Sequence, residues 1–532
     1  MARQARRYFI PFLLVFILGF AVIRWQDLGQ SVFSEMPENP FRIGVVGDAS
    51  GIDPAQALSP GERLAASALY EPLLRYDGET GSLKPCLALN WGYSKDGMRV
   101  VFMLDRSVRF HNGRRLSAAD VKRSWERSLK MDGGATRSRI MFDSIQGVGA
   151  FLSGKADHVS GIRARDNATL EIALGKPDAV FLQKTTHPIF WVLDTLDEGP
   201  VAPGTGPFRL ISGDEKSSDL ILIRNKTYHG PRPGLEALAF TWLSDSGKGI
   251  EAFGHGELDL VEGISAGEAA RLRNDPAMGG KLVEKPIYGI YALGFRVQEY
   301  PFNDADFRRA LSFSLDREGL AESVFAGMAI PSKGILPVNS PGYNKALQGY
   351  SYNPERGREL FVGTLFAGEN NPRPIRLWYN EDAGHETLMK AIASQADVLG
   401  LGLNPIALSW PVYAKKLTQG ELGFYRIGWE ADYPDPDAFL YPLFHSRMRG
   451  VTNYTGYSNP RVDKLLDAAR AQTHNTGKRI KLLRQAEQII VDDAPMIWLF
   501  ERKALFLIRP EVRGLTVNGM QYIDWTRLKQ NP

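Results

Sequence analysis

Four carboxylates lie close together in residues 424–440, which read FYRIGWEADYPDPDAFL. The acids are Glu430, Asp432, Asp435 and Asp437, and the aromatic residues among them are Trp429 and Tyr433. Such a cluster could exchange protons with a substrate, bind a metal ion, or bind an ammonium or guanidinium group that also contacts an aromatic face. The plain alternative is a Pro-Asp turn with solvated acids, and the local sequence leaves these possibilities open.

Two prolines determine what kind of element carries these acids. Pro434 and Pro436 lack a backbone donor and fix their own φ, so neither fits inside a helix or a central strand. The apolar residues before them favour a strand. The sequence therefore predicts a strand followed by a loop that holds the acids. Catalysis on this loop would need a nucleophile or an activated water, and no partner constellation is evident.

Ser265 is a second candidate for chemistry, at the centre of a G-x-S-x-G pattern. The pattern lies between the strand-like LDLV and the helix-like EAARLR, which is the context of a nucleophile elbow. Ser265 and Glu268 also make the S-x-x-E pattern of a capping box. We interpret Ser265 as a helix cap and keep a serine hydrolase as the alternative from another class.

The remaining patterns do not favour a metal or phosphate site. The sequence HETLM at 385–389 begins like a zinc helix but has Met389 where the second histidine ligand must stand. The glycines of APGTGPF at 202–208 lack the spacing of a phosphate-binding loop, so we expect a turn before the strand FRLI. We predict no catalytic residue, no metal and no cofactor.

Charge and cysteine content exclude other classes. The net charge of +4 over 532 residues reflects four arginines in the first 24 residues, and the remainder is neutral. A neutral body lacks the basic face that nucleic acids need. The single cysteine, Cys86, excludes intramolecular disulfides, and its apolar neighbours predict a buried side chain.

The N-terminal sequence is typical of an export signal. The run from Tyr8 to Ile23 is uncharged and strongly apolar, and arginines precede it. Its length lies between those of a secretory signal and a spanning helix, and no clean cleavage site follows. We predict an uncleaved signal anchor with a polar tether up to residue 40, with a cleaved signal peptide as the alternative. Either way the body lies outside the cytoplasmic membrane.

Several segments together resemble the family 5 solute-binding proteins of ABC importers, which include dipeptide- and oligopeptide-binding proteins. The similar segments, in order, are GIDPAQA, LYEPLLRYDGETGSLKPCLALNW, GMRVVFMLDRSVRFHNGRRLSAADVKRSWER, GTGPFRL, LGFRVQEYPFNDADFRRALSFSLDRE and GWEADYPDPDAFL. Each is weak alone, but the ordered set is specific. It covers essentially the whole chain from about residue 41.

The resemblance implies a two-lobed α/β fold like that of periplasmic binding proteins (type II, class C-like), here with an N-terminal membrane segment. Residues 1–40 would be the anchor and tether, 41–292 the first part of lobe I, 293–499 lobe II, and 500–532 the return to lobe I. The lobes would close over a ligand, and the closed form would be recognised by permease subunits in the membrane. The receptor would be a monomer and not an enzyme.

The resemblance also implies which residues bind the ligand. Peptide-binding members have an aspartate three positions after the motif tryptophan, which pairs with the α-ammonium; here this is Asp432, after Trp429. Backbone groups of Gly428 and Glu430 would pair with the peptide main chain. The other expected pocket residues are Trp429, Tyr433, Ala49, Ser50 and Gly51. Asp435 and Asp437 are expected only to shape the turn beyond the pocket.

One departure from the family pattern concerns the ligand carboxylate. Dipeptide-binding relatives hold it with an arginine shortly after the strand that corresponds to IRLWYN, but here EDAGHETLMK follows, without arginine. A longer peptide whose carboxyl end is held elsewhere, or a ligand without a carboxylate, fits better, and Glu430 slightly favours a more positive ligand. The prediction is a receptor for oligopeptide-like, amine-bearing ligands; a nickel chelate, haem, an opine or an oligosaccharide is the alternative within the fold.

Overall fold

The computed structural model describes residues 39–47, 51–57, 59–131, 136–197, 199–213, 219–369 and 373–530. The apolar run at residues 8–23 lies outside the described residues, as do Ala49 and Ser50. Within the ranges given above, no helix is both long and apolar enough to cross a membrane.

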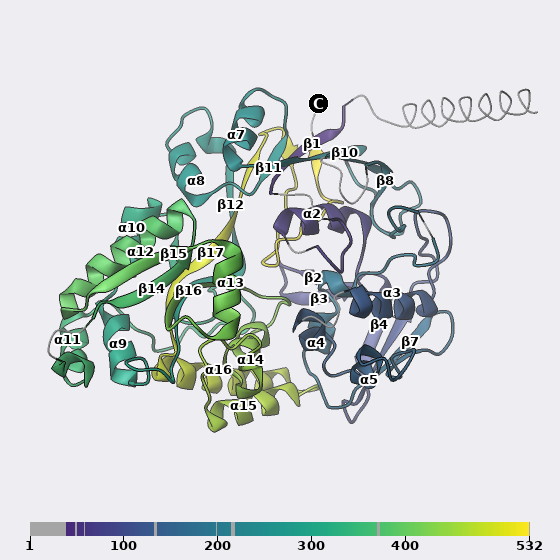
Figure 1. The fold of residues 1–532 in the computed structure, drawn as a ribbon. Coiled ribbons are helices and arrows are strands. Elements are labelled where there is room, and N and C mark those ends of the chain that lie inside the picture. Colours follow the sequence, from purple (N-terminus) through teal and green to yellow (C-terminus); the bar gives the residue numbers. More distant parts are fainter. Residues whose placement is uncertain are drawn as a thin grey trace, which may run out of the picture.

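Strands and helices are interspersed along the chain, as the sequence predicts for a mixed α/β fold (Figure 1). The strands are β1 (Phe41–Val46), β2 (Leu74–Asp77), β3 (Ser82–Pro85), β4 (Ala88–Tyr93), β5 (Arg99–Leu104), β6 (Ile162–Ala164), β7 (Thr169–Ala173), β8 (Phe208–Ser212), β9 (Asp219–Arg224), β10 (Ala237–Leu243), β11 (Leu260–Glu262), β12 (Leu282–Phe295), β13 (Ile330–Pro331), β14 (Ile375–Asn380), β15 (Leu403–Leu408), β16 (Phe424–Glu430), β17 (Met496–Ile508), β18 (Val512–Arg513) and β19 (Lys529–Gln530). The α-helices are α2 (Pro60–Leu69), α3 (Ala118–Met131), α4 (Thr136–Met141), α5 (Val148–Leu152), α6 (Phe181–Lys184), α7 (Ser246–Gly254), α8 (Ala266–Arg273), α9 (Ala305–Ser314), α10 (Arg317–Phe325), α11 (Pro354–Val362), α12 (Ala383–Ala396), α13 (Trp410–Gln419), α14 (Asp437–Phe444), α15 (Pro460–Arg470) and α16 (Thr476–Asp493).

The largest sheet of the described chain runs through the whole molecule. Its strand order is β15-β14-β16-β12-β17-β11-β1-β10-β9-β8, and β13 also pairs with β17. β1 is parallel to β10 and β11, whereas β12 is antiparallel to both β16 and β17. The sheet is therefore mixed.

Two long strands connect the two halves of the molecule. β12 and β17 pair along most of their length, and the register shifts between Pro286 and Ile290. On one side of this shift β17 pairs with β11, and on the other side β12 pairs with β16. In Figure 1 the strands up to β10 with α2–α5 form the N-terminal half, and β14–β16 with α9–α13 form the C-terminal half. The lobe boundaries at residues 292 and 499 stay a prediction, since both lie inside these shared strands.

Each half has a hydrophobic core of its own. The N-terminal half buries Phe41, Ile43, Phe240 and Trp525 in one cluster. The C-terminal half buries a different cluster, which includes Leu293, Phe307, Leu388 and Phe424. A third and larger cluster combines residues of the N-terminal half, such as Trp125 and Phe190, with residues of segment 413–498, such as Tyr425 and Leu440, so the two halves also pack against each other.

Ser265 is the N-cap of α8, as the sequence predicts. Its hydroxyl oxygen accepts the backbone N–H of Glu268 at 3.3 Å, and its own O–H is 2.9 Å from Glu268 Oε2. The Glu268 carboxylate also accepts the hydroxyl of Ser246, so it bonds side chains instead of closing the second half of a capping box. The hydroxyl of Ser265 thus has a structural role at the start of a helix.

Replacing Ser265 by alanine is expected to lower the free energy of unfolding by about 1 kcal/mol, because the N-cap bond is lost. Esterase turnover should be absent from both proteins. The matched control is Ser323→Ala, since Ser323 lies on the exposed surface of α10 and donates to the Gly319 carbonyl, and it should be nearly neutral. Thermal unfolding and hydrolysis of a chromogenic ester measure the two effects. An esterase activity that disappears only in Ser265→Ala would restore the hydrolase alternative.

Two further local predictions agree with the structure. Residues 202–207 form a loop that leads into β8. Cys86 is buried, and burial raises the pKa of its thiol to about 12.

Candidate functional site

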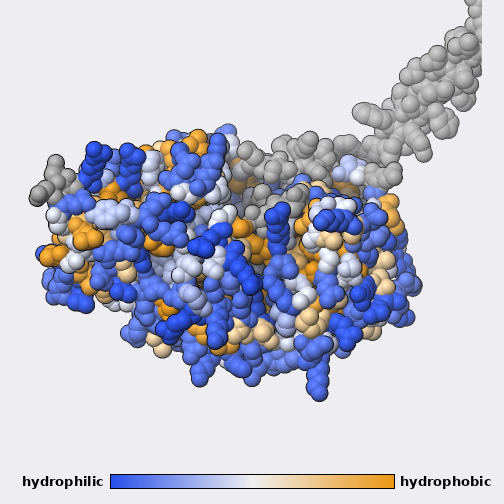
Figure 2. Space-filling model, turned by 60° about the horizontal axis from the view of Figure 1, so that its bottom comes forward, coloured by the Kyte–Doolittle hydropathy of each residue, from blue (hydrophilic) through white to orange (hydrophobic). Residues whose placement is uncertain are grey.

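A cavity of 420 Å³ lies at the junction of the two halves, where β16 ends. It is lined by Arg63, Arg137, Ile140, His187, Tyr288, Gly428, Trp429, Glu430, Ala431, Asp432, Thr452, Arg502, Gly519, Met520, Gln521 and Tyr522. The volume is typical of small-ligand pockets, which span about 300–1,000 Å³. The space-filling view in Figure 2 shows a mostly hydrophilic surface with apolar residues visible in the recess between the halves.

The strand that carries the site ends at this junction for a local reason. β16 pairs with β12 in the register Glu430↔Gly289 and Gly428↔Tyr291, directly beyond the register shift of β12. The backbone N–H of Ala431 then donates to the Tyr288 carbonyl at 2.8 Å. Because the prolines that follow cannot extend a strand, the chain turns away and leaves the next side chain, Asp432, in the cavity.

Asp432 faces cationic and polar groups of the N-terminal half. Its Oδ1 lies 3.7 Å from Nε of Arg137 and 3.8 Å from Nε2 of His187. The carboxylate accepts no hydrogen bond from the rest of the described chain, and its side chain keeps 26% of its surface exposed. An ionised carboxylate without donors in a partly enclosed site is well suited to bind the N–H groups of a ligand.

The cavity changes the ionisation of Asp432 and His187. Burial raises the pKa of Asp432, and Glu430 acts in the same direction, whereas Arg137 and Arg63 act against it. Burial, together with Arg137 and Arg63, lowers the pKa of His187 well below its usual value. His187 is therefore neutral at pH 7. Its Nδ1 accepts the N–H of Ile189 at 3.1 Å, so its proton is on Nε2, which faces Asp432.

Glu430 is already bound by protein groups. Its carboxylate contacts Arg502 and accepts a hydrogen bond from Nε2 of Gln521 at 2.9 Å. It also lies 3.4 Å from Nη2 of Arg63. These contacts connect the end of β16 to the N-terminal half. They do not support the prediction that Glu430 favours a more positive ligand, because its charge is balanced within the protein.

Gly428 and Trp429 lie where the sequence predicts pocket residues. Trp429 lines the cavity, and its indole N–H donates to the Ala438 carbonyl at 2.9 Å, which fixes the ring. On the side of β16 away from β12, the pairing with β14 consists of the bridge Trp378↔Tyr425. No described strand pairs with this edge between Gly428 and Glu430, so it can accept an extended ligand backbone.

Of the other predicted pocket residues, the two that the structure describes, Tyr433 and Gly51, do not line this cavity. Tyr433 is buried, and its hydroxyl donates to Oδ2 of Asp437 at 2.6 Å, so it holds the loop from behind. Gly51 is buried with a φ of +151°, and it is not part of the cavity wall. Ala49 and Ser50 lie outside the described residues. Among the described residues, Arg137 and His187 approach Asp432 from the N-terminal half.

Asp435 and Asp437 lie beyond the cavity, as predicted, but they are buried instead of solvated. Oδ1 of Asp435 accepts Nη1 of Arg479 at 2.8 Å, and a second contact joins Nη2 to Oδ2. Asp437 accepts Nε and Nη2 of Arg470 at 2.9 and 2.7 Å. The Arg470 guanidinium also lies 3.3 Å from the ring centroid of Tyr441. Burial alone would raise the pKa of Asp437, but Arg470 holds it below its usual value.

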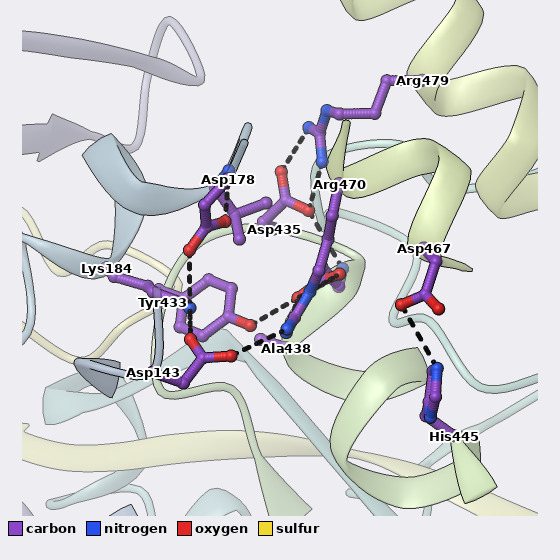
Figure 3. A network of polar contacts seen from close by, with 12 residues as sticks. Asp143, Asp178, Lys184, Tyr433, Asp435, Ala438, His445, Asp467, Arg470 and Arg479 are labelled. Atoms are coloured by element: carbon purple, nitrogen blue, oxygen red, sulfur yellow. Dashed lines mark hydrogen bonds and ion pairs between the residues drawn. The ribbon is translucent and has the colours of Figure 1, made fainter. Parts of the chain in front are cut away.

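These ion pairs continue into the N-terminal half (Figure 3). Nη1 of Arg470 lies 3.6 Å from Oδ2 of Asp143, and Asp143 also bonds the buried Nζ of Lys184 at 2.9 Å. Lys184 in turn bonds Asp178 at 2.9 Å. The loop behind Asp432 is thus connected by buried charges to α15 and α16 on one side and to α6 on the other.

Sequence reasoning missed the basic residues of the site. Arg63, Arg137 and Arg502 come from distant parts of the chain, and no local pattern marks them. The segment after β14 lacks the arginine of dipeptide-binding relatives, but an arginine from another strand lies beside the end of β14. Arg426 of β16 donates from Nη1 to Oδ1 of Asn380 at 3.1 Å and lies over the ring of Tyr291.

Two halves that share paired strands and enclose a polar cavity define a class of ligand-binding proteins that close around their ligand. Comparisons with known proteins agree. The family described as bacterial extracellular solute-binding proteins, family 5, middle region, matches residues 82–450. The heme-binding protein A of Haemophilus influenzae is 26% identical over 501 residues, 89% of each chain. The dipeptide-binding protein of Escherichia coli is 26% identical over 514 residues, covering 89% of this chain and 91% of its own.

A solved structure shows the same fold. HbpA2 from Haemophilus parasuis superposes with a TM-score of 0.79 at 22% sequence identity. The match covers 93% of this chain and 100% of HbpA2. The chain belongs to the family 5 bacterial extracellular solute-binding proteins.

Proposed function

We propose that this protein is the exported solute-binding receptor of an ABC importer, which captures peptides with a free amino terminus and delivers them to permease subunits in the membrane. The observation that carries the proposal is Asp432, a carboxylate without a hydrogen-bond donor in the described chain, in the cavity between two halves that can close. Relatives named for dipeptides and oligopeptides support the ligand class. The receptor acts as a monomer and performs no catalytic step.

The charges of the cavity favour a peptide over a simple amine. Arg63, Arg137 and Arg502 face the two carboxylates of Glu430 and Asp432. Arg137 has its ion-pair contact, within the described chain, with Asp432. When a ligand ammonium takes that place, the guanidinium of Arg137 is released to bind a carbonyl or carboxylate of the same ligand. The unpaired edge of β16 supplies the main-chain contacts between these ends.

The N-terminal run at residues 8–23 is proposed to anchor the receptor to the outer face of the cytoplasmic membrane. Its apolar sequence after basic residues supports this, with a cleaved export signal as the alternative. Membrane fractionation with N-terminal sequencing of the mature protein distinguishes the two.

Identification of the natural ligand tests the proposed function. The protein is purified under native conditions and unfolded, and the released small molecules are identified by mass spectrometry. Peptides with free amino termini are the expected result, and calorimetry with the same peptides should then give saturable binding. Recovery of haem, a nickel chelate, an opine or a sugar instead would contradict the peptide assignment and leave the fold unchanged.

Peptide affinity should decrease on acidification because Asp432 becomes protonated. The ammonium group binds the ionised carboxylate, and burial raises the pKa of Asp432 above its ordinary value. Below this raised pKa the association constant should decrease by about tenfold per pH unit, because a proton must leave before the amine binds. Calorimetry between pH 4 and 8 measures the effect. Asp432→Asn should show no such slope, and an equal slope in both proteins would exclude Asp432 as the titrating group.

A further inference from the structure

A second cavity lies directly beside the first. It has a volume of 690 Å³, against 420 Å³ for the cavity of Asp432. It lies between the C-terminal segment 515–527 and the region around β2 and β12. Tyr288, Gly519 and Tyr522 line both cavities, so these residues form the boundary between them. We refer to the larger space as the aromatic chamber.

Hydrogen bonds fix the residues that the two cavities share. The backbone N–H of Tyr288 donates to the Gly519 carbonyl at 2.7 Å, and the hydroxyl groups of Tyr288 and Tyr76 are 2.8 Å apart. A Cβ on residue 519 would lie 2.4 Å from the Tyr288 ring, so only glycine permits this approach. The carbonyl of Tyr288 accepts the N–H of Ala431, next to Asp432. Tyr288 therefore connects the wall of the aromatic chamber to the loop that carries Asp432.

The lining of the chamber combines aromatic rings with charges that are mostly paired. Tyr76, Trp191 and Tyr288 line it, and Trp191 packs against Tyr522 with their ring centroids 5.4 Å apart. The charged side chains form the pairs Arg75–Glu71 at 2.9 Å, Lys84–Asp77 at 4.0 Å and Arg527–Glu79 at 2.7 Å.

Lys285 is the exception among the cationic residues of the lining. It belongs to β12, and within the part of the chain that the structure describes it has no acidic partner within ion-pair distance. The chamber thus offers aromatic surface for apolar side chains and one ammonium group for an anion.

We propose that the aromatic chamber is a second subsite, which takes the carboxyl-terminal part of a peptide whose amino terminus is bound at Asp432. Apolar or aromatic side chains contact the rings, and the terminal carboxylate pairs with Lys285. This inference rests on the proposed function and extends it: the ligand is longer than a peptide that fills the first cavity, and its far end is recognised. It also gives the carboxylate a partner in a chain that lacks the family arginine after β14.

Blocking the chamber tests the inference. Thr516 lines it, and its buried Oγ1 has no hydrogen-bond partner among the described residues, so a larger apolar side chain removes no described bond. Thr516→Phe should weaken binding of penta- and hexapeptides with aromatic residues near the carboxyl terminus at least tenfold, and should change the affinity of di- and tripeptides less than twofold. Thr516→Val is the matched control and should change neither. Retained binding of the short peptides also shows that the variant is folded.

The charge of Lys285 is tested with the same long peptides as free acids and as carboxyl-terminal amides. Lys285→Met should weaken the free acid about tenfold and leave the amide unchanged. Lys503→Met is the control, because Lys503 lies on the neighbouring strand and pairs with Glu284. Equal effects of Thr516→Phe on short and long peptides, or no effect on either, would overturn the subsite. If the wild-type protein binds no peptide of any length, the proposed function itself fails.

Discussion

Replacing Asp432 by asparagine is expected to weaken the binding of a peptide with a free amino terminus by about 100-fold, or about 2.7 kcal/mol. Asparagine keeps the shape of the side chain but has no charge, so the ligand ammonium loses its charge-assisted bonds. The amide also presents a donor toward Arg137, whose Nε lies 3.7 Å from Oδ1 in the native protein. Calorimetry with one peptide in free and N-acetylated forms measures the effect.

Acetylation and substitution together form a double-mutant cycle that isolates the contact. The wild-type protein should lose most of its affinity when the peptide is acetylated, whereas Asp432→Asn should bind both forms about equally. Glu430→Gln is the matched control, because the carboxylate of Glu430 is already bound by Arg502 and Gln521. That variant should still discriminate against the acetylated peptide. If Asp432→Asn discriminates as strongly as the wild type, the amine binds elsewhere.

The second large effect is expected from Arg470→Met, which removes a buried charge and keeps a similar volume. Asp437, 1% exposed, would be left without its guanidinium partner, and within the described part of the chain only the hydroxyl of Tyr433 would remain as its side-chain donor. Removal of one partner of a buried ion pair costs about 3–5 kcal/mol of unfolding free energy. Because the same loop positions Asp432, peptide affinity should decrease as well.

An exposed ion pair provides the control for this substitution. Arg356 and Glu359 on α11 are 2.8 Å apart, with 53% and 64% of their side chains exposed. Arg356→Ala should cost less than about 1 kcal/mol, because water screens and solvates both charges. Urea unfolding at pH 7 compares the two variants. A similar small cost for both would mean that the network behind the loop contributes little to stability.

Much of the local structure could be predicted from the sequence. The strand at Phe424–Glu430 and the loop after it follow from an apolar run that ends in alternating prolines. The cap at Ser265 also agrees with the structure. These features depend on neighbours within a few positions, so short patterns are sufficient to predict them.

The partners of the acids could not be predicted in this way. Arg470 and Arg479 follow Asp437 and Asp435 by 33 and 44 positions, and their pairing results from the packing of α15 and α16 against the loop. The sequence favoured solvated acids at these two positions because it contains no sign of burial there. Tyr433 likewise has the residue type of a pocket wall, but its hydroxyl is bound to Asp437 behind the loop.

The sequence by itself determined the family resemblance, the strand and loop of the site, and Asp432 as the predicted amine anchor. The tertiary structure alone decided what Asp432 faces, since Arg137 and His187 reach it from the other half of the molecule. It also decided that Glu430 is neutralised by protein groups, and that a second cavity adjoins the first. The physical reason is that charge balance and cavity shape depend on groups brought together by packing, and a linear pattern does not record their distances.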